Sequence, residues 1–164
     1  MREIKGDLIK LALAGEFQVI AHGCNCRHTM GAGIAEQIAK TFPMASSVDS
    51  GFNRYLGDIS CAWFKNENND CLQVINAYTQ IHWGMNNRRH RQDHPTKGKL
   101  VDSKENRYMA IRESMKTINW LFTGQSIGIP LIGCGKARGD WKVVKKILEE
   151  ELIDMDVTIV HYDK

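Results

Sequence analysis

The chain has 164 residues, of which 43% are hydrophobic, and a formal net charge of +3. A chain of this length and apolar content can bury the core of one domain, so we expect a single domain over residues 1–164. The small excess of positive charge is compatible with an anionic ligand, but it is far below that of a dedicated nucleic-acid-binding domain.

The cysteines and the N-terminus indicate the compartment. An odd number of dispersed cysteines does not form a disulfide framework and is typical of a reducing cytosol. The N-terminal sequence MREIKGD is charged where a signal peptide is apolar, and no run approaches the roughly 18 apolar residues that a membrane span needs. We therefore expect a cytoplasmic protein without a membrane partner. The five cysteines are Cys24, Cys26, Cys61, Cys71 and Cys134.

Residues 17–42 predict a strand, a glycine-rich bend and a helix. The apolar run Val-Ile-Ala at 19–21 is typical of a strand that is buried on both faces, which we expect over residues 17–25. Gly31 and Gly33 lack the Cβ atom that would block a close approach to a ligand. Apolar residues then recur at helical spacing before Pro43 ends the helix, namely Ile34, Ile38 and Phe42.

Two further strands, over residues 58–64 and 71–79, are predicted to form a hairpin. The sequence between them, NENND at 66–70, is a turn-forming cluster. A hairpin pairs its strands antiparallel, whereas the other strands alternate mostly with helices. The sheet is therefore expected to be mixed and mostly parallel.

Residues 80–103 have no hydrophobic period, and loops of this length are usually functional or disordered. They could form a basic flap over a ligand cleft, a contact for nucleic acid or an acidic partner, or a solvated insertion. Trp83 is essentially the only aromatic residue there that could stack on a base, so nucleic-acid binding ranks second. The basic residues of this segment include Arg88, Arg89, Arg91, Lys97 and Lys99.

The C-terminal part alternates helices and strands. We expect helices over residues 104–122 and 140–152, with Asp102 and Glu105 at capping-box spacing before the first. Strands are expected over residues 126–132 and 157–162. Pro130 fits best where the hydrogen bonding of its strand ends.

A second glycine-rich loop, GCGKARG at 133–139, resembles the first in its place between a strand and a helix. If the two preceding strands are parallel neighbours, both loops emerge at their carboxyl ends, where open α/β sheets bind ligands. The first amides of a helix have no partner within it and carry the positive end of its dipole. Two such loops side by side predict a pyrophosphate site.

Four short motifs follow one another over nearly the whole chain. They are KGDL at 5–8, HGCNC at 22–26, MGAGIA at 30–35 with the Phe-Pro stop at 42–43, and IGCG at 132–135 followed by GDW at 139–141. Together they resemble a macro domain, and most closely the small stand-alone branch found in bacteria, their viruses and yeast. The resemblance implies a three-layer α/β/α fold with a mixed, mostly parallel central sheet and a cleft for ADP-ribose.

The resemblance also implies ligand contacts. Asn25 would hold the distal ribose hydroxyls, because its amide offers both a donor and an acceptor, although Asn is also common before turns for local reasons. The two loops would bind the pyrophosphate mainly through backbone amides. The loop residues in question are Met30, Gly31, Ala32, Gly33, Ile34, Gly133, Cys134, Gly135, Lys136, Ala137 and Arg138.

An adenine site is implied near the first motif. Asp7 would accept a hydrogen bond from the adenine amino group, with the Leu8 backbone nearby, or would simply cap the short segment 8–13. Tyr162, at the end of the last strand, would lie against the adenine ring or merely finish the sheet.

For catalysis, the resemblance implies a role for His22 beside the distal ribose as acid, base or nucleophile. Histidine exchanges a proton near neutral pH, but a histidine on a strand is also often a hydrogen-bonded core residue. An acid partner is not identified by the sequence. Asp140 is the candidate for the acid partner, although it could equally be the N-cap of its helix. Of the other aspartates, Asp102 is explained by capping, and Asp93 lies in the long loop without a predicted structure.

Two departures from the family pattern limit the chemistry. Relatives that hydrolyse ADP-ribosyl groups through a lysine carry it where this chain has Gln80, and those relatives also have an aspartate at the place of Ala137. Without these side chains, the lysine route and an ordinary water activation at this point are both doubtful.

A metal site is a further possibility, because four potential ligands fall within seven residues. Zinc sites usually space cysteines by two to four residues and take a second pair from another segment, which this sequence does not offer. We therefore expect no metal and no cofactor, with the cysteines packed as small apolar side chains. The four residues are His22, Cys24, Cys26 and His28.

The resulting functional hypothesis is a phosphatase that hydrolyses ADP-ribose 1''-phosphate to ADP-ribose and phosphate. The alternatives are a module that binds or sequesters ADP-ribose without turnover, an ADP-ribosyl hydrolase acting on an ADP-ribosylated macromolecule, and, ranked lower, a nucleic-acid binder that uses the basic residues between 88 and 99.

Overall fold

The computed structural model describes residues 1–82 and 102–162. The strands are β1 (Arg2–Gly6), β2 (Val19–Asn25), β3 (Ile59–Lys65), β4 (Cys71–Gln80), β5 (Ser126–Ile129) and β6 (Asp156–Tyr162). The helices are α1 (Leu8–Leu13), α2 (Gly33–Thr41), α3 (Pro43–Ser50), α4 (Lys104–Leu121) and α5 (Trp141–Glu151).

The strands form one six-stranded sheet in the order β1-β6-β5-β2-β4-β3. Every neighbouring pair is parallel except β3 and β4, which form the predicted antiparallel hairpin. The strands that precede the two glycine-rich loops, β2 and β5, are parallel neighbours, with Val19 opposite Ile127. Both loops therefore leave the sheet at the same edge.

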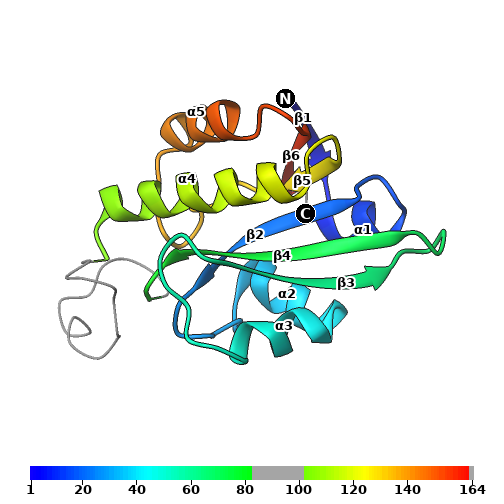
Figure 1. Cartoon of the computed structure of the whole chain (residues 1–164), viewed down its shortest axis with the longest axis horizontal. Coiled ribbons are helices and arrows are strands. Elements are labelled where there is room, and N and C mark those ends of the chain that lie inside the picture. The colour runs from blue at the N-terminus through cyan, green and yellow to red at the C-terminus, as the bar shows by residue number, and fades with distance from the viewer. Residues whose placement is uncertain (83–101, 163–164) are drawn as a thin grey trace.

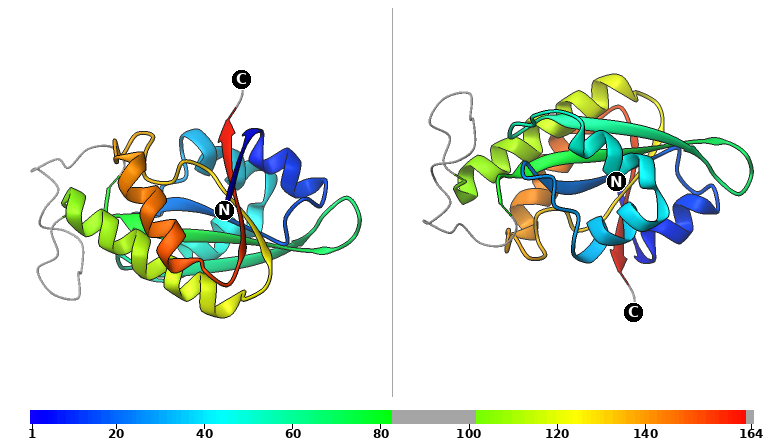
Figure 2. Two further views of the ribbon diagram at one scale, coloured as in Figure 1. Left: turned by 90° about the horizontal axis from the view of Figure 1, so that it is seen from above. Right: turned by 90° about the horizontal axis from the view of Figure 1, so that it is seen from below.

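Helices cover both faces of the sheet (Figure 1). Helices α4 and α5 pack on one face around a buried cluster that includes Ile111, Met115 and Leu148. Helices α1, α2 and α3 pack on the other face around a cluster that includes Phe17, Ile38 and Phe42. The predicted three-layer α/β/α fold with a mixed, mostly parallel sheet is confirmed. The two views in Figure 2 show the same layers from above and below.

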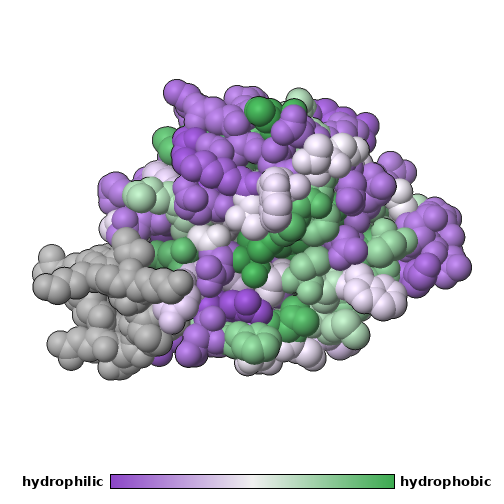
Figure 3. Space-filling view, viewed as in Figure 1, coloured by the Kyte–Doolittle hydropathy of each residue, from purple (hydrophilic) through white to green (hydrophobic). Residues whose placement is uncertain are grey.

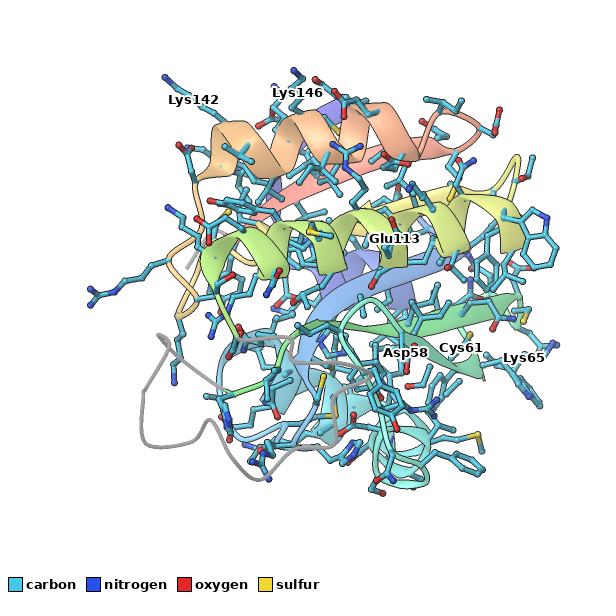
Figure 4. All side chains as sticks on the ribbon, turned by 60° about the vertical axis from the view of Figure 1, so that its left-hand side comes forward. Asp58, Cys61, Lys65, Glu113, Lys142 and Lys146 are labelled. Carbon is cyan, nitrogen blue, oxygen red and sulfur yellow. The ribbon has the colours of Figure 1, made fainter. Side chains whose placement is uncertain are left out.

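The amphipathic pattern of α5 explains its packing. Val144, Ile147 and Leu148 are buried against the sheet, whereas Lys142 and Lys146 are exposed and point away from it (Figure 4). A helix with one apolar face gains most of its stability from burying that face.

Strand β5 is shorter than predicted. The sequence indicated a strand over residues 126–132, but the strand ends at Ile129, directly before Pro130. Proline has no amide hydrogen for the ladder, and Ile132 N instead donates to Pro130 O in a tight turn. The side chain of Ile132 still reaches the core, where it is 2% exposed.

Two elements were missed in the sequence. Strand β1 pairs with the last strand, β6, although its residues are largely exposed and carry no apolar alternation. Helix α3 begins at Pro43, which was interpreted only as the end of the preceding helix. Proline is tolerated at the first position of a helix because its missing amide hydrogen would have no partner there.

The cap of α4 also differs from the prediction. Ser103, not Asp102, is the N-cap, and its side chain accepts a hydrogen bond from Asn106 N. Asp102 is 5% exposed, forms an ion pair with Arg107 at 2.6 Å and accepts a hydrogen bond from His82 N. The carboxylate of Asp102 therefore ties the end of β4 to α4.

The outer surface is mixed in polarity. Hydrophilic residues predominate over α5, and hydrophobic ones gather in a band between α4 and the β3–β4 side of the sheet (Figure 3). In the described ranges, none of the helices combines the length and apolar character that crossing a membrane requires. Of the predicted long loop, Trp83, Asp93 and the basic residues Arg88, Arg89, Arg91, Lys97 and Lys99 lie outside the described residues.

Candidate ligand-binding site

A cleft of about 520 Å³ lies between the loop after β2 and the loop after β5. This volume is within the range of small-molecule sites, and the position at the carboxyl ends of parallel strands is where open α/β sheets bind ligands. The cleft is lined by many of the predicted residues, namely Asn25, Gly31, Ala32, Gly33, Ile34, Gly133, Gly135, Lys136 and Ala137.

The first wall of the cleft is the N-terminus of α2. Its N-cap, Ala32, has an extended backbone and no side-chain cap hydrogen bond. Gly33 has a positive φ of 62°, and a Cβ atom at Gly31 or Gly33 would meet no described atom within 4 Å. The first residues of α2 line the cleft and no side chain caps their amides, so an anion could take the place of the missing cap.

The second wall is the loop after β5, which is held in shape by its own backbone. Gly133 has a positive φ of 71°, and its carbonyl accepts a hydrogen bond from Gly139 N at 2.9 Å. A Cβ atom at Gly139 would lie only 2.6 Å from that carbonyl oxygen. Glycine is therefore needed at both ends of the loop.

Not every amide of this loop is available to a ligand. The amides of Cys134 and Arg138 donate to Leu131 O and Gly135 O, and neither residue lines the cleft. Their predicted ligand contacts are not found in this geometry, because these amides shape the loop. The loop residues that line the cleft on this wall, and whose amides can serve as donors, are Gly133, Gly135, Lys136 and Ala137.

Asn25 lines the cleft, but its side chain mainly organises the loop that follows it. Oδ1 accepts hydrogen bonds from Arg27 N at 3.0 Å and Thr29 N at 3.3 Å, and Nδ2 donates to Thr29 O at 2.9 Å. This is the local hydrogen bonding that is typical of Asn before a turn. One hydrogen of the amide group remains for a ligand.

His22, earlier in β2, is not among the residues that line the cleft. Its side chain is 0% exposed, and Nε2 is 2.8 Å from Oδ1 of Asn76, an atom that can only accept a hydrogen bond. Burial lowers the pKa of His22 to about 4, so the ring is neutral near pH 7. In this geometry His22 is a hydrogen-bonded core residue outside the cleft lining, and its role as acid, base or nucleophile stays a prediction.

Asp140 and Asp7 both cap helices. Asp140 is the N-cap of α5 and accepts a hydrogen bond from Lys142 N, outside the lining of the cleft. Its position does not fit the expected acid partner. Oδ1 of Asp7 accepts hydrogen bonds from Ile9 N and Lys10 N at the start of α1. Each carboxylate thus stabilises the positive end of a helix.

The predicted adenine site lies at the same edge of the sheet as the cleft but outside its lining. Gly6, directly before Asp7, pairs with Tyr162 across β1 and β6. Tyr162 is 59% exposed as a residue, whereas Leu8 is buried in the core. Met30 does not line the cleft either, because it packs against the cluster beneath α2.

Several cleft residues were missed in the sequence. Thr79 comes from the end of β4, which is the strand beside β2, so the strand order reveals it. Gln80, at the same strand end, also lines the cleft, and the resemblance had marked its position only as that of a lysine in relatives. Gly23 faces them, and a Cβ atom there would lie 3.0 Å from Oγ1 of Thr79. The other missed lining residues are Cys24, Thr29, Ala35, Pro130, Leu131 and Ile132.

The cysteines near the cleft are unreactive in character. Burial raises the pKa of Cys24 well above its usual value and that of Cys26 to about 12, so both remain thiols. Cys134 is half-buried, and burial raises its pKa to about 11. Within residues 1–82 and 102–162, no three His, Cys, Asp or Glu side chains come together in a way that could hold a metal ion.

The described lining therefore combines backbone amides with neutral polar side chains and one cation, Lys136. None of the described lining residues carries a carboxylate or an imidazole. Such a surface can hold an anionic, hydroxyl-rich ligand by hydrogen bonds and by the dipole of α2.

A six-stranded mixed sheet between two helical layers, with this cleft at the carboxyl ends of its strands, defines the macro-domain fold. The macrodomain of Mycobacterium tuberculosis DarG superimposes with a TM-score of 0.66 and 21% identity, over 97% of this chain and 95% of that one. Thermosipho africanus DarTG in complex with ADP-ribose superimposes with a TM-score of 0.67 and 16% identity, over 98% of this chain and 40% of that one.

A sequence relative extends the comparison. A 17.5 kDa protein from the tk-vs intergenic region of Enterobacteria phage T4 is 30% identical over 174 residues, which cover 99% of this chain and 97% of the phage protein. No protein-family model matches the sequence. The chain therefore has the fold of a macro domain and belongs to the same family as this phage protein.

Proposed function

We propose that the protein binds ADP-ribose in the cleft between its two glycine-rich loops. The observation that carries the proposal is the pair of facing donor sets, one at the uncapped N-terminus of α2 and one in the loop after β5. A diphosphate bridge has anionic oxygens on both sides, so it can use both sets at once. The complex of Thermosipho africanus DarTG with ADP-ribose supports the same ligand class.

The proposed orientation follows from the positions of the side chains. The pyrophosphate lies between the amides of residues 31–34 and those of residues 135–137, and the distal ribose lies beside Asn25 and Thr29. The adenine extends along the sheet edge toward Asp7 and Tyr162. The second oxygen of Asp7 and the exposed face of Tyr162 suit an exocyclic amine and an aromatic ring.

Hydrolysis of ADP-ribose 1''-phosphate is the second candidate function. Lys136 and the loop amides suit a further phosphoryl group, because they would also stabilise the negative charge that develops on it. His22 and Asp140 do not line the cleft, so neither is included in this reaction. Binding without turnover is therefore the first proposal, and an ADP-ribosylated macromolecule is a further possible partner.

A thermal-shift titration with ADP-ribose, ADP and AMP tests binding. A ligand present at 100 times its dissociation constant adds about 2.7 kcal/mol to the free energy of unfolding. We expect the largest shift with ADP-ribose, a smaller one with ADP and the smallest with AMP. Equal shifts with all three ligands would show that neither the distal ribose nor the pyrophosphate contributes to binding. Release of phosphate from ADP-ribose 1''-phosphate then distinguishes turnover from binding alone.

A further inference from the structure

A buried carboxylate ties the first loop of the cleft to helix α3. His28, on the loop after β2, has Nδ1 3.3 Å from Oδ1 of Asp49 in α3. The hydroxyl of Tyr78, on β4, donates to the same oxygen at 2.7 Å. Asp49 is 1% exposed and Tyr78 is 0% exposed. A carboxylate at such depth is tolerated only when hydrogen bonds and charges compensate its lost hydration.

A chain of hydrogen bonds leads to this carboxylate, and in each of them the donor lies on the side away from Asp49. Because Tyr78 gives its proton to Asp49, Ser60 Oγ, at 2.9 Å, must donate to the Tyr78 oxygen. Ser60 in turn accepts from Asn76 Nδ2 at 3.0 Å, and Asn76 accepts from His22 Nε2 at 2.8 Å. Aligned hydrogen bonds polarise one another, so the whole row stabilises the negative charge of Asp49.

Two neighbouring groups, the Tyr78 hydroxyl and the Arg54 guanidinium, affect the surroundings of Asp49. Burial raises the pKa of the Tyr78 hydroxyl, so this group remains a donor at ordinary pH. Cζ of Arg54 lies 5.6 Å from the centroid of the Tyr78 ring, while its guanidinium donates to Val48 O. The other described partner of the carboxylate is the ring of His28.

The backbone at His28 has a conformation that such an anchor would stabilise. Its φ of 58° lies in the left-handed region, which is uncommon for residues other than glycine, although asparagine, aspartate and histidine adopt it more often than other residues do. Strained positions of this kind persist only where the surroundings hold them. Three residues further along, Gly31 begins the stretch whose amides face the cleft. The conformation at His28 therefore sets the path of the chain into the binding wall.

We propose that Asp49 is a positioning residue: it holds the ring of His28 and so keeps the amides of residues 31–34 arranged for an anion before the ligand arrives. That the ligand is ADP-ribose rests on the proposed function. The contact between Asp49 and His28, in contrast, is a property of the free protein. A wall ordered in advance lowers the entropy lost on binding.

Amide hydrogen exchange of the free, full-length protein tests the anchor, with Asp49→Asn and His28→Asn as variants. Asparagine keeps the size of Asp49, and it tolerates the left-handed backbone at position 28. We expect amides of residues 27–34 to exchange at least roughly tenfold faster in both variants, while α4 is unchanged. The dissociation constant for ADP-ribose should rise by a similar factor. Lys146→Gln, which removes an exposed ion pair on α5, is the control and should change neither.

Unchanged exchange of residues 27–34 in both variants would overturn the proposal. An equal increase in α4 would do so too, because Asp49 would then stabilise the fold as a whole. If Asp49→Asn does not fold, Tyr78→Phe and His28→Asn decide the matter, since each removes one contact of the carboxylate. If residues 27–34 exchange faster in the variants but the protein does not bind ADP-ribose, the proposed function is contradicted. The role of Asp49 in holding the loop is then still supported.

Discussion

The polar side chains around the cleft are largely committed to the protein itself. Asn25 shapes its own loop, Asp7 and Asp140 cap helices, and His22 is hydrogen-bonded in the core. Recognition of a ligand therefore falls mainly to the backbone amides of the two loops. Amides carry no net charge, so a charged side chain placed among them should have a large effect on an anionic ligand.

Gly135 offers a test of this electrostatic argument. A side chain at this position meets no described atom within 4 Å, so the fold should tolerate a substitution. We expect Gly135→Glu to weaken ADP-ribose binding by at least about tenfold relative to Gly135→Gln, because only the carboxylate repels the pyrophosphate. Calorimetric titration of both variants measures the difference. Equal affinities would show that the pyrophosphate does not lie at this loop.

The lowered pKa of His22 predicts a pH-dependent contribution to stability. The unfolded state takes up a proton near pH 6.5, whereas the buried ring does so only near pH 4, so the native state loses stability as pH falls between these values. At pH 4.5 the loss should be about 2–3 kcal/mol.

Chemical denaturation of the wild type and His22→Gln at pH 7 and pH 4.5 measures this contribution, because other titrating groups cancel in the comparison. The difference in unfolding free energy between the two proteins should shrink by about 2–3 kcal/mol at the lower pH. A difference that does not change with pH would mean that His22 is not buried as a neutral ring.

At the scale of elements, the two capping candidates before α4 have different roles. Ser103→Ala removes a single cap hydrogen bond and should cost about 1 kcal/mol. Asp102→Asn removes one charge of a buried ion pair, a change that should cost about 3 kcal/mol or more. Urea denaturation of the two variants ranks them. A larger loss for Ser103→Ala would contradict the assignment of the cap.

The sequence predicted those elements whose apolar residues recur with a clear period. Strand β2 and helices α2, α4 and α5 were found, as was the hairpin, because NENND can form little but a turn. Strand β1 was missed because it lies at an edge with mostly exposed side chains, so pairing with β6 alone defines it. Helix α3 was missed because Pro43 both ends one helix and starts the next.

The candidate site was predictable where a glycine pattern or a strand end marks it, as at Gly33 and Asn25. The sequence could not predict the environment of His22, because β2 is buried on both faces and hydrophobic periodicity cannot distinguish one face from the other. Thr79 could be assigned to the cleft only after β4 was known to lie beside β2, whereas the position of Gln80 was marked by the family resemblance.

At the scale of the whole molecule, the layers depend on close packing over the central strands. A Cβ atom at Gly128 in β5 would lie 2.6 Å from Cδ2 of Phe17 and 2.8 Å from Cδ1 of Leu8. Gly128→Ala should therefore destabilise the protein by about 1–3 kcal/mol, as overpacking of cores commonly does. Gly135→Ala, in open space, is the matched control and should have little effect. Equal unfolding free energies for the two variants would contradict this packing.

The site depends on the same arrangement, because only the parallel neighbours β2 and β5 bring the two loops to one edge of the sheet. A crystal structure of the protein with ADP-ribose is the most direct test. We expect the pyrophosphate oxygens to accept hydrogen bonds from amides of residues 31–34 on one side and of residues 135–137 on the other. A ligand bound elsewhere, or one that contacts a single loop, would contradict the proposed site.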